Sequence, residues 1–253
     1  MQIIKCLWVC IVVLFPAGIK GNTPHDLWTE ANQAYQRSEY IHAIELYENL
    51  LKLDIVSSEL YYNLGNAYFR NNNIGKAVLN YERAIRIDPA NDNIQHNLEI
   101  AKSRTIDNVV PRAKLFYERW WRSIYNMQSA NGWGITGIIF LSLFLIFLAT
   151  YFFAHTMWMK KSAFYTAGVL LLFTVFSVIF AQTQYNRINN QKEAIIMVPR
   201  VTVKSSPSGQ SPDIFLIHEG TKVFLRTSLD GWYEINLADG NIGWIKMDSF
   251  EVI

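Results

Sequence analysis

The sequence predicts a multidomain membrane protein made of an all-α repeat array, a two-helix transmembrane hairpin and a small all-β barrel. Three observations lead to this fold class. Residues 24–91 match themselves when the chain is shifted by 34 positions, residues 135–154 and 163–181 contain no charged side chain, and residues 193–253 alternate apolar and polar side chains between turn signals. A period of 34 is typical of stacked helix pairs, long uncharged runs are typical of membrane-crossing helices, and alternation is typical of strands.

The N-terminus has the layout of a secretory signal. Lys5 precedes an apolar run from Cys6 to Phe15, and small residues follow the run. Such a segment directs export and is normally removed, which predicts a signal peptide over residues 1–21. The cleavage site is poor, so a retained anchor stays open as an alternative, and lipid attachment at Cys10 is a second one. Both cysteines lie in this segment, so the rest of the chain holds no disulfide and no thiol chemistry.

The 34-residue register defines two helix–turn–helix units and a cap within residues 24–105. Identical side chains meet at Asn32/Asn66, Ala43/Ala77, Tyr47/Tyr81, Glu48/Glu82 and Asp54/Asp88. Each unit leaves an apolar face that only a neighbouring unit can bury, so the units stack and require a cap. Residues 91–104 place Ile94, Leu98 and Ala101 on one helical face and are predicted to be the capping helix. The second copy resembles the tetratricopeptide repeat, at Leu64, Gly65, Tyr68, Ala77, Tyr81, Ala84 and Pro89.

The resemblance to the tetratricopeptide repeat implies a binding groove along the first helix of each repeat. Transferred by register, the groove positions combine aromatic and amide side chains: Trp28, Asn32, Tyr35, Gln36, Tyr62, Asn66, Phe69 and Arg70. Such side chains suit an extended peptide or a partner helix. One version of the family clamps a C-terminal carboxylate, but Trp28, Asn93 and Asn97 stand where its basic residues are expected. The alternative for Asn32 and Asn66 is that both only follow the repeat consensus.

Residues 111–134 are predicted to form an amphipathic juxtamembrane segment. Aromatic and basic side chains interleave here, at Phe116, Trp120, Trp121, Tyr125, Arg112, Lys114, Arg119 and Arg122. Tryptophan and tyrosine prefer the level of the lipid headgroups, and long basic side chains reach phosphates beside them. The prediction is an interfacial helix that leads into the bilayer. A surface helix packed on the repeats is the alternative.

The two uncharged runs are predicted to be transmembrane helices. A helix over residues 135–154 rises roughly 30 Å, enough to cross the hydrocarbon core, and residues 163–181 form a run of similar length. The loop between them, residues 155–162, is too short to fold. The runs therefore form a hairpin, and both soluble domains lie on one side of the membrane. Residues 182–192 are predicted to be a polar connector.

Residues 193–253 are predicted to form short strands in a small β-barrel. Apolar side chains alternate in residues 201–204 and 223–226, and turn signals separate such segments. The segment resembles the bacterial SH3-type domain at Val201, Val203, Pro207, Glu219, Gly220, Thr221, Gly231, Trp232, Gly243, Trp244 and Ile245. A barrel of this size has a thin core, to which Trp232 and Trp244 are expected to contribute much. With Tyr233 they are also a candidate surface for cell-wall peptides, the ligands that the resemblance implies.

The sequence contains no recognisable catalytic, metal or cofactor motif. The five histidines show no metal-ligand spacing, and no G-x-S-x-G nucleophile motif occurs. The glycine pattern of residues 132–137 opens a predicted transmembrane helix rather than a βαβ unit, which argues against nucleotide binding. Outside residues 1–21 the chain carries 21 basic and 21 acidic residues, which does not point to nucleic acid. We therefore predict a non-enzymatic binding protein without a cofactor.

The charge distribution leaves the orientation of the hairpin open. Basic residues on the outer flanks outnumber Lys160 and Lys161 of the loop, which favours cytoplasmic domains, but the loop is denser in positive charge, which favours a cytoplasmic loop. The export signal decides between them. It predicts a two-pass protein of the bacterial inner membrane with both soluble domains in the periplasm and the 155–162 loop in the cytoplasm.

The order of the parts resembles the E-type family of the Bacteroides aerotolerance (Bat) operons. This resemblance implies a non-enzymatic subunit of a membrane assembly that supports oxygen or stress tolerance. Its partners would be von Willebrand A-domain membrane proteins and, on the cytoplasmic side, a MoxR-type ATPase. The main hypothesis is a membrane-anchored scaffold whose periplasmic repeats bind a partner protein. The alternatives are a cell-wall sensor that binds peptidoglycan through the β domain, and a cytoplasmic co-chaperone.

Overall fold

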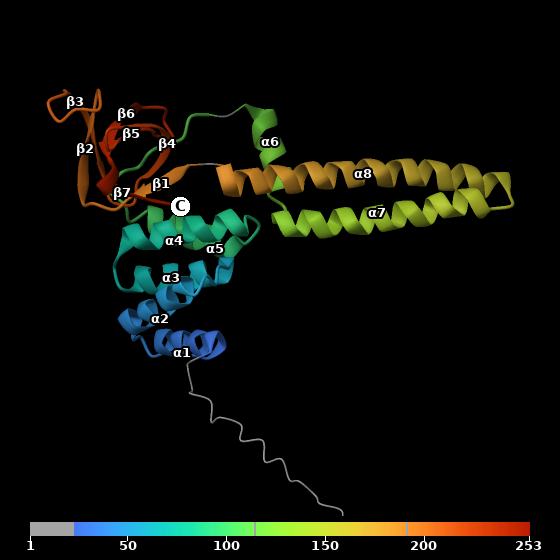
Figure 1. Cartoon of the computed structure of the whole chain (residues 1–253), viewed down its shortest axis with the longest axis horizontal. Coiled ribbons are helices and arrows are strands. Elements are labelled where there is room, and N and C mark those ends of the chain that lie inside the picture. Colours follow the sequence, from blue (N-terminus) through green and yellow to red (C-terminus); the bar gives the residue numbers. More distant parts are fainter. Residues whose placement is uncertain (1–22, 114, 191) are drawn as a thin grey trace, which may run out of the picture.

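The computed structural model describes residues 23–113, 115–190 and 192–253. The predicted signal peptide lies outside the described residues. A stack of helices and a β-sheet lie against each other, and a long helical hairpin extends away from them (Figure 1). We call the helical array and the sheet together the head.

Residues 23–113 form five helices that confirm the predicted helical repeat array. The helices are α1 (Pro24–Gln36), α2 (Tyr40–Lys52), α3 (Ser58–Arg70), α4 (Ile74–Ile87) and α5 (Asp92–Lys102). Successive helices pack on one another, and Figure 1 shows them stacked from α1 up to α4 and α5, which lie next to the sheet.

The 34-residue register is visible in the helix starts and turns. Thr23, Ser57 and Asn91, each 34 residues from the next, are the N-caps of α1, α3 and α5, and each side chain accepts a hydrogen bond from the first turn. Ser38 and Asn72, also 34 apart, both adopt left-handed backbone, with φ of 63° and 60°. Polar side chains at N-caps bond the free amides of the first turn, and short polar residues tolerate left-handed backbone better than bulky ones. The 34-residue repeat therefore extends to the helix caps and turns as well as to the core.

The array has a tightly packed core in which Gly65 permits the closest approach. A Cβ atom at this position would lie 2.8 Å from the ring of Tyr81, whose side chain is 1% exposed. The absence of a side chain at Gly65 therefore lets α3 and α4 approach each other closely.

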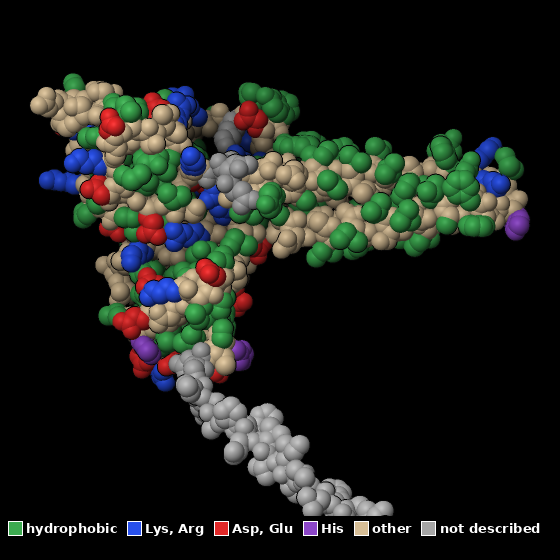
Figure 2. All heavy atoms as spheres, viewed as in Figure 1, with side chains coloured by type: hydrophobic (Ala, Val, Ile, Leu, Met, Phe, Trp, Pro, Cys, Tyr) green, Lys and Arg blue, Asp and Glu red, His purple; other side chains and the backbone are tan. Residues whose placement is uncertain are grey.

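The hairpin consists of α7 (Ala130–Phe153) and α8 (Met157–Asn190), which pack along each other. In the described part of the chain, these two helices are long and apolar enough to cross a membrane by length and composition. Figure 2 shows hydrophobic side chains along the visible face of the hairpin and basic ones at its far tip. Helix α6 (Phe116–Tyr125) packs against α8, where the Trp121 and Phe180 ring centroids are 5.1 Å apart.

Two predicted segments around α8 differ in the structure. The loop predicted over residues 155–162 is shorter, because α8 begins at Met157 and takes in both lysines. The predicted connector over residues 182–192 is helical as far as Asn190. Polar residues do not end a helix by themselves, and the side chain of Gln184 is held by the carbonyl of Tyr125 at 2.7 Å.

Residues 192–253 form an antiparallel sheet. Its strands are β1 (Glu193–Ile196), β2 (Arg200–Lys204), β3 (Asp213–His218), β4 (Lys222–Leu229), β5 (Trp232–Asn236), β6 (Ile242–Lys246) and β7 (Phe250–Val252). The order is β3-β2-β6-β5-β4-β1-β7, and a short 3-10 turn, Met247–Ser249, precedes β7. The all-β prediction is confirmed, but within residues 192–253 the outer strands β3 and β7 do not pair, so the barrel is not closed by hydrogen bonding.

The core of the sheet is aliphatic, which corrects the prediction that two tryptophans supply much of it. The buried cluster consists of Ala194, Ile196, Val203, Ile217, Val223, Ile235, Leu237 and Ile245. Trp232 and Trp244 are only half-buried and stand outside this cluster. Each alternates along its strand with a core residue, Ile235 in β5 and Ile245 in β6, so the pleat turns the tryptophans to the other face.

Strand β1 joins the two parts of the head. Ala194 and Ile196 belong to the core of the sheet, while Ile195 is fully buried in the core of the repeat array. Successive side chains of a strand point to opposite faces, so β1 is covered by the sheet on one face and by α4 on the other. The array and the sheet therefore share buried apolar surface.

Candidate functional site

The predicted groove positions lie along the first helices of the repeats, but only half of them line one hollow. A hollow of about 130 Å³ brings together Tyr35, Asn66, Phe69 and Arg70 with Tyr81, Asn97 and Ile100. Of the other predicted positions, Trp28 packs edge-on against Tyr47 with ring centroids 6.0 Å apart, and Gln36 is exposed. Tyr62 stands behind the hollow, where its hydroxyl accepts a hydrogen bond from Asn97 Nδ2 at 3.0 Å.

Each of the two groove asparagines joins the two helices of its own repeat through its side-chain carbonyl oxygen. Asn32 Oδ1 accepts a hydrogen bond from Tyr47 Oη, and Asn66 Oδ1 accepts one from Tyr81 Oη, both at 2.7 Å. Burial raises the pKa of both tyrosines, so they remain neutral donors. Asn97 Nδ2 adds a second bond to Asn66 Oδ1 at 2.8 Å. The amide oxygens are therefore occupied, which supports a structural role for these asparagines.

The groove extends onto residues that the groove prediction did not include. Ile100 on α5 lines the hollow, and the Arg104 guanidinium lies 5.6 Å from the centre of the Phe69 ring. Arg70 donates from Nε to the hydroxyl of Tyr40 at 3.1 Å. Arg104 stands 34 residues after Arg70, so extending the register to the capping helix would have found it. The two arginines give this end of the groove a positive rim.

The three predicted aromatic residues of the sheet do not share one face. Trp232 is paired in register with Lys246, and Trp244 with Glu234, so these four side chains lie on the face opposite the core. The Lys246 ammonium lies 5.9 Å from the centre of the Trp232 ring. Tyr233 points to the core face, where its ring packs edge-on against Phe250 at 5.3 Å.

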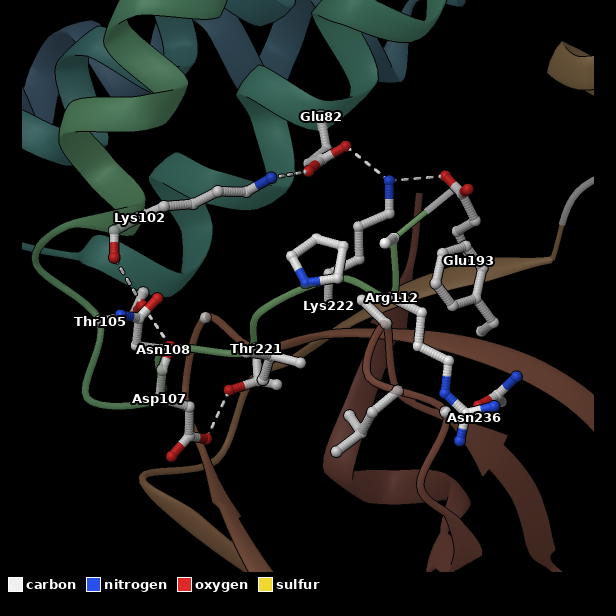
Figure 3. A pocket seen from close by; sticks show the side chains of 18 of the residues that line it. Glu82, Lys102, Thr105, Asp107, Asn108, Arg112, Glu193, Thr221, Lys222 and Asn236 are labelled. Carbon is white, nitrogen blue, oxygen red and sulfur yellow. Dashed lines mark hydrogen bonds and ion pairs between the residues drawn. The ribbon is translucent and has the colours of Figure 1, made fainter. Parts of the chain in front are cut away.

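A buried charge network joins the array to the sheet. Glu82 of α4 is 5% exposed and accepts bonds from Lys102 Nζ at 2.6 Å and from Lys222 Nζ at 2.7 Å. Lys222 also reaches Glu193 of β1 at 2.8 Å. Figure 3 shows Lys102 and Lys222 approaching Glu82 from opposite sides. Burial alone would raise the pKa of Glu82, but the two ammonium groups outweigh it and hold this pKa well below its usual range.

The connecting segment after α5 is fixed to the sheet by Asp107. Its carboxylate accepts hydrogen bonds from the His218 backbone N–H and from Thr221 Oγ1, each at 2.6 Å, and lies 2.8 Å from His218 Nδ1. Burial opposes ionisation, but these donors lower the pKa of Asp107. The hydroxyl bonds to the carboxylate rather than to the imidazole, so the cluster is not arranged to activate a nucleophile.

Further contacts run along the whole of α4. Glu219 Oε1 accepts from the backbone N–H of Gly75 at 3.1 Å, near the start of the helix. Arg83 donates to Glu251 Oε1 at 2.9 Å, and Arg86 donates to the backbone oxygen of Ile253 at 2.6 Å. Helix α4 is thus covered by α3 and α5 on one side and contacts the sheet on the other.

Comparison with known proteins identifies one repeat. A model of the tetratricopeptide repeat family matches residues 58–91, which cover α3 and α4. The match spans a small part of the chain. No curated protein matches the sequence. Tetratricopeptide repeats are non-catalytic units that bind proteins, so the matched repeat indicates a protein-interaction scaffold with protein partners.

Proposed function

We propose that this protein is a membrane-anchored scaffold that binds a partner protein in the groove of its repeats. The observation that carries the proposal is the hollow between α3 and α5, where aromatic and amide side chains meet under a basic rim. Phe69 and Tyr35 are half-buried, so a partner side chain that covers them adds apolar contact without large rearrangement. Arg70 and Arg104 favour a partner segment that carries an acidic side chain.

The hairpin supplies the membrane anchor in this proposal. Its large apolar side chains are exposed on both helices, among them Ile138 at 66%, Phe152 at 67% and Leu172 at 60%. Exposure of such an apolar surface to water would cost free energy, whereas contact with lipid acyl chains would not. Since the array and the sheet contact each other, they lie on the same side of the bilayer. We assign that side to the periplasm, because an export signal is predicted before the repeats.

The sequence resemblance to the E-type family of the Bat operons suggests the process. Repeats, amphipathic helix, hairpin and a C-terminal domain resembling the bacterial SH3 type follow one another in the order of that family. The proposed partners are von Willebrand A-domain membrane proteins, and the proposed process is an envelope assembly that supports aerotolerance or stress resistance. The antiparallel sheet of residues 192–253 is compatible with the SH3-type resemblance although its strand pairing is open.

Co-purification of the full chain with its partner tests the groove. Asn66 is unsuitable as a test residue, because its replacement would leave the buried Tyr81 hydroxyl without an acceptor. Arg70→Ala combined with Arg104→Ala removes the rim instead, and Lys52→Ala on the exposed end of α2 is the control. We expect the double variant to lose the partner while the control retains it. Equal recovery by both would rule out the groove rim as the binding site.

A second function, binding of cell-wall peptides by the sheet, is favoured by one observation. Trp232, Trp244, Glu234 and Lys246 form an aromatic and charged patch on the face away from the core. Amphipathic rings next to opposite charges suit a short peptide that carries both amine and carboxylate groups. Retention of the full chain on purified cell wall tests it. Trp232→Ala should reduce retention, and Ile41→Ala, at an exposed apolar residue of α2 outside the sheet, should not. No retention of the unmodified protein would remove this function.

A further inference from the structure

We propose that the cavity at the foot of the hairpin is a binding site for a phosphate-bearing anion, held by Arg112, Arg122 and Arg187. The cavity has a volume of about 770 Å³ and is lined by residues of the array, the connecting segment, the sheet, α6 and the end of α8. A cavity of some 300–1,000 Å³ is the usual size for a small-molecule site. Five parts of the chain contribute to its lining, so it forms only where the head meets α6 and the end of α8.

The charges that line the cavity fall into a neutralised set and a free set. Lys102 and Lys222 are satisfied by Glu82 and Glu193, at distances of 2.6 to 2.8 Å. Asp107 is satisfied by the donors of the sheet described above. The two lysines and two glutamates neutralise one another, whereas Asp107 keeps its negative charge and is held by donors of the sheet.

The free set is basic. Among the residues that the structure describes, none of Arg112, Arg122 and Arg187 has a carboxylate within the 4.0 Å ion-pair distance. Glu118, the remaining acidic residue of the lining, has no basic partner within this distance either. The whole lining holds five basic residues against four acidic ones, Glu82, Asp107, Glu118 and Glu193, which leaves an excess of one positive charge. Arg112 and Arg122 are exposed, so the cavity is open to solvent, and unpaired charge that lines such a cleft attracts a ligand of the opposite sign.

Each arginine keeps donors available for such a ligand. Arg112 Nε donates to the backbone oxygen of Asp239 at 2.5 Å, and Arg187 Nη1 donates to Asn126 Oδ1 at 3.2 Å. Arg122 makes no side-chain hydrogen bond within the described residues. A guanidinium group carries five N–H donors, so the two anchored arginines are positioned by one bond each and retain the others.

Phosphate is the anion class that fits this arrangement best. The three arginines stand on three separate elements, the connecting segment, α6 and α8, and all of them line the one cavity. A phosphate presents several oxygens around one centre, and arginine binds pairs of them with its planar fork. The site also lies where a lipid phosphate would be, since α6 beside it exposes Phe116 at 78% and Trp120 at 65%. The lipid source rests on the proposed membrane anchor; a soluble phosphate does not.

Binding of defined phosphates to the detergent-purified full chain tests the proposal. The probes are dioctanoyl-phosphatidylglycerol, followed by native mass spectrometry, and inorganic phosphate, followed by calorimetry. Dioctanoylglycerol, which lacks the phosphate, controls for binding through the acyl chains. The test variant is Arg122→Gln. Within the described residues the Arg122 side chain makes no hydrogen bond, so its replacement breaks none. Arg119→Gln, on the same helix but outside the cavity lining, is the matched control.

We expect the unmodified protein to bind at least one phosphate probe and not dioctanoylglycerol. Arg122→Gln should weaken binding about tenfold, since one charge-assisted contact is lost, and Arg119→Gln should leave it unchanged. Arg187→Lys, which keeps the charge but loses the fork, should weaken it less than Arg187→Gln. Binding of the lipid alone identifies a headgroup site, and equal binding of inorganic phosphate identifies a soluble ligand. No phosphate binding, or equal losses in Arg119→Gln and Arg122→Gln, would overturn the proposal whether or not the repeats bind a partner.

Discussion

Replacement of Glu82 by glutamine tests the buried network that joins the array to the sheet. Glutamine keeps the shape of the side chain but removes its charge, so Lys222 keeps only Glu193 as an ionic partner. Lys102 is 44% exposed at its side chain and can return to water at little cost. The loss is therefore dominated by the bond to Lys222, which is 21% exposed, and we expect a decrease of about 2 to 3 kcal/mol in the free energy of unfolding.

Hydrogen exchange and thermal unfolding of the full chain measure this effect. The amides of β1 (Glu193–Ile196) should exchange faster in Glu82→Gln, because this strand is covered by α4 on one face. The midpoint of unfolding should fall with it. Glu59→Gln, an exposed carboxylate on α3, is the matched control and should change neither quantity. Unchanged exchange in β1 of Glu82→Gln would refute the claim that the network holds the array and the sheet together.

Three further predictions concern the pH dependence of Glu82, the packing at Gly65 and the hydrogen bonds of Asp107. The pKa of Glu82 is lowered by folding, so its stabilisation is present above about pH 4.3 and is lost as the pH falls toward the folded-state pKa; an acid titration of unfolding should be flatter in Glu82→Gln than in the unmodified protein. Gly65→Ala places a Cβ atom 2.8 Å from the ring of Tyr81 and should lower the free energy of unfolding by about 1 to 2 kcal/mol despite the better helix propensity of alanine, as measured by denaturant titration; a gain in stability would show that the ring moves aside. Asp107→Asn weakens the bonds to His218 and should make residues 103–113 more sensitive to limited proteolysis, whereas unchanged cleavage would mean that other contacts hold this segment.

The parts of the fold that depend on local pattern could be predicted from the sequence. The match of Tyr47 with Tyr81 and of Asn32 with Asn66 reflects a real repetition. In the structure Tyr47 donates a hydrogen bond to Asn32, and Tyr81 donates the equivalent bond to Asn66. The uncharged runs gave the two long apolar helices, and alternation gave the strands, because helix and strand periods are local properties. The groove positions were assigned by register, and half of them line one hollow in the structure. Arg104 was missed because the register was not followed as far as residue 104.

The packing of the array against the sheet could not be predicted, because its partners are far apart in the sequence. Glu82 looks like a solvent-exposed helix residue, yet Lys102 and Lys222 lie 20 and 140 residues after it. The alternation around Ile195 indicates a buried strand without saying what covers its second face. The tryptophans were assigned to the core on size alone, whereas the pleat sends Trp232 outward.

Thiol accessibility in intact spheroplasts tests most directly that the array and the sheet share one side of a membrane crossed by the hairpin. Single cysteines replace the exposed residues Lys52, Ser162 and Ser208, in a background where Cys6 and Cys10 are alanine. A membrane-impermeant maleimide added outside should label positions 52 and 208, and should label position 162 only after the cells are permeabilised. Different labelling of positions 52 and 208, or labelling of all three from outside, would contradict the account.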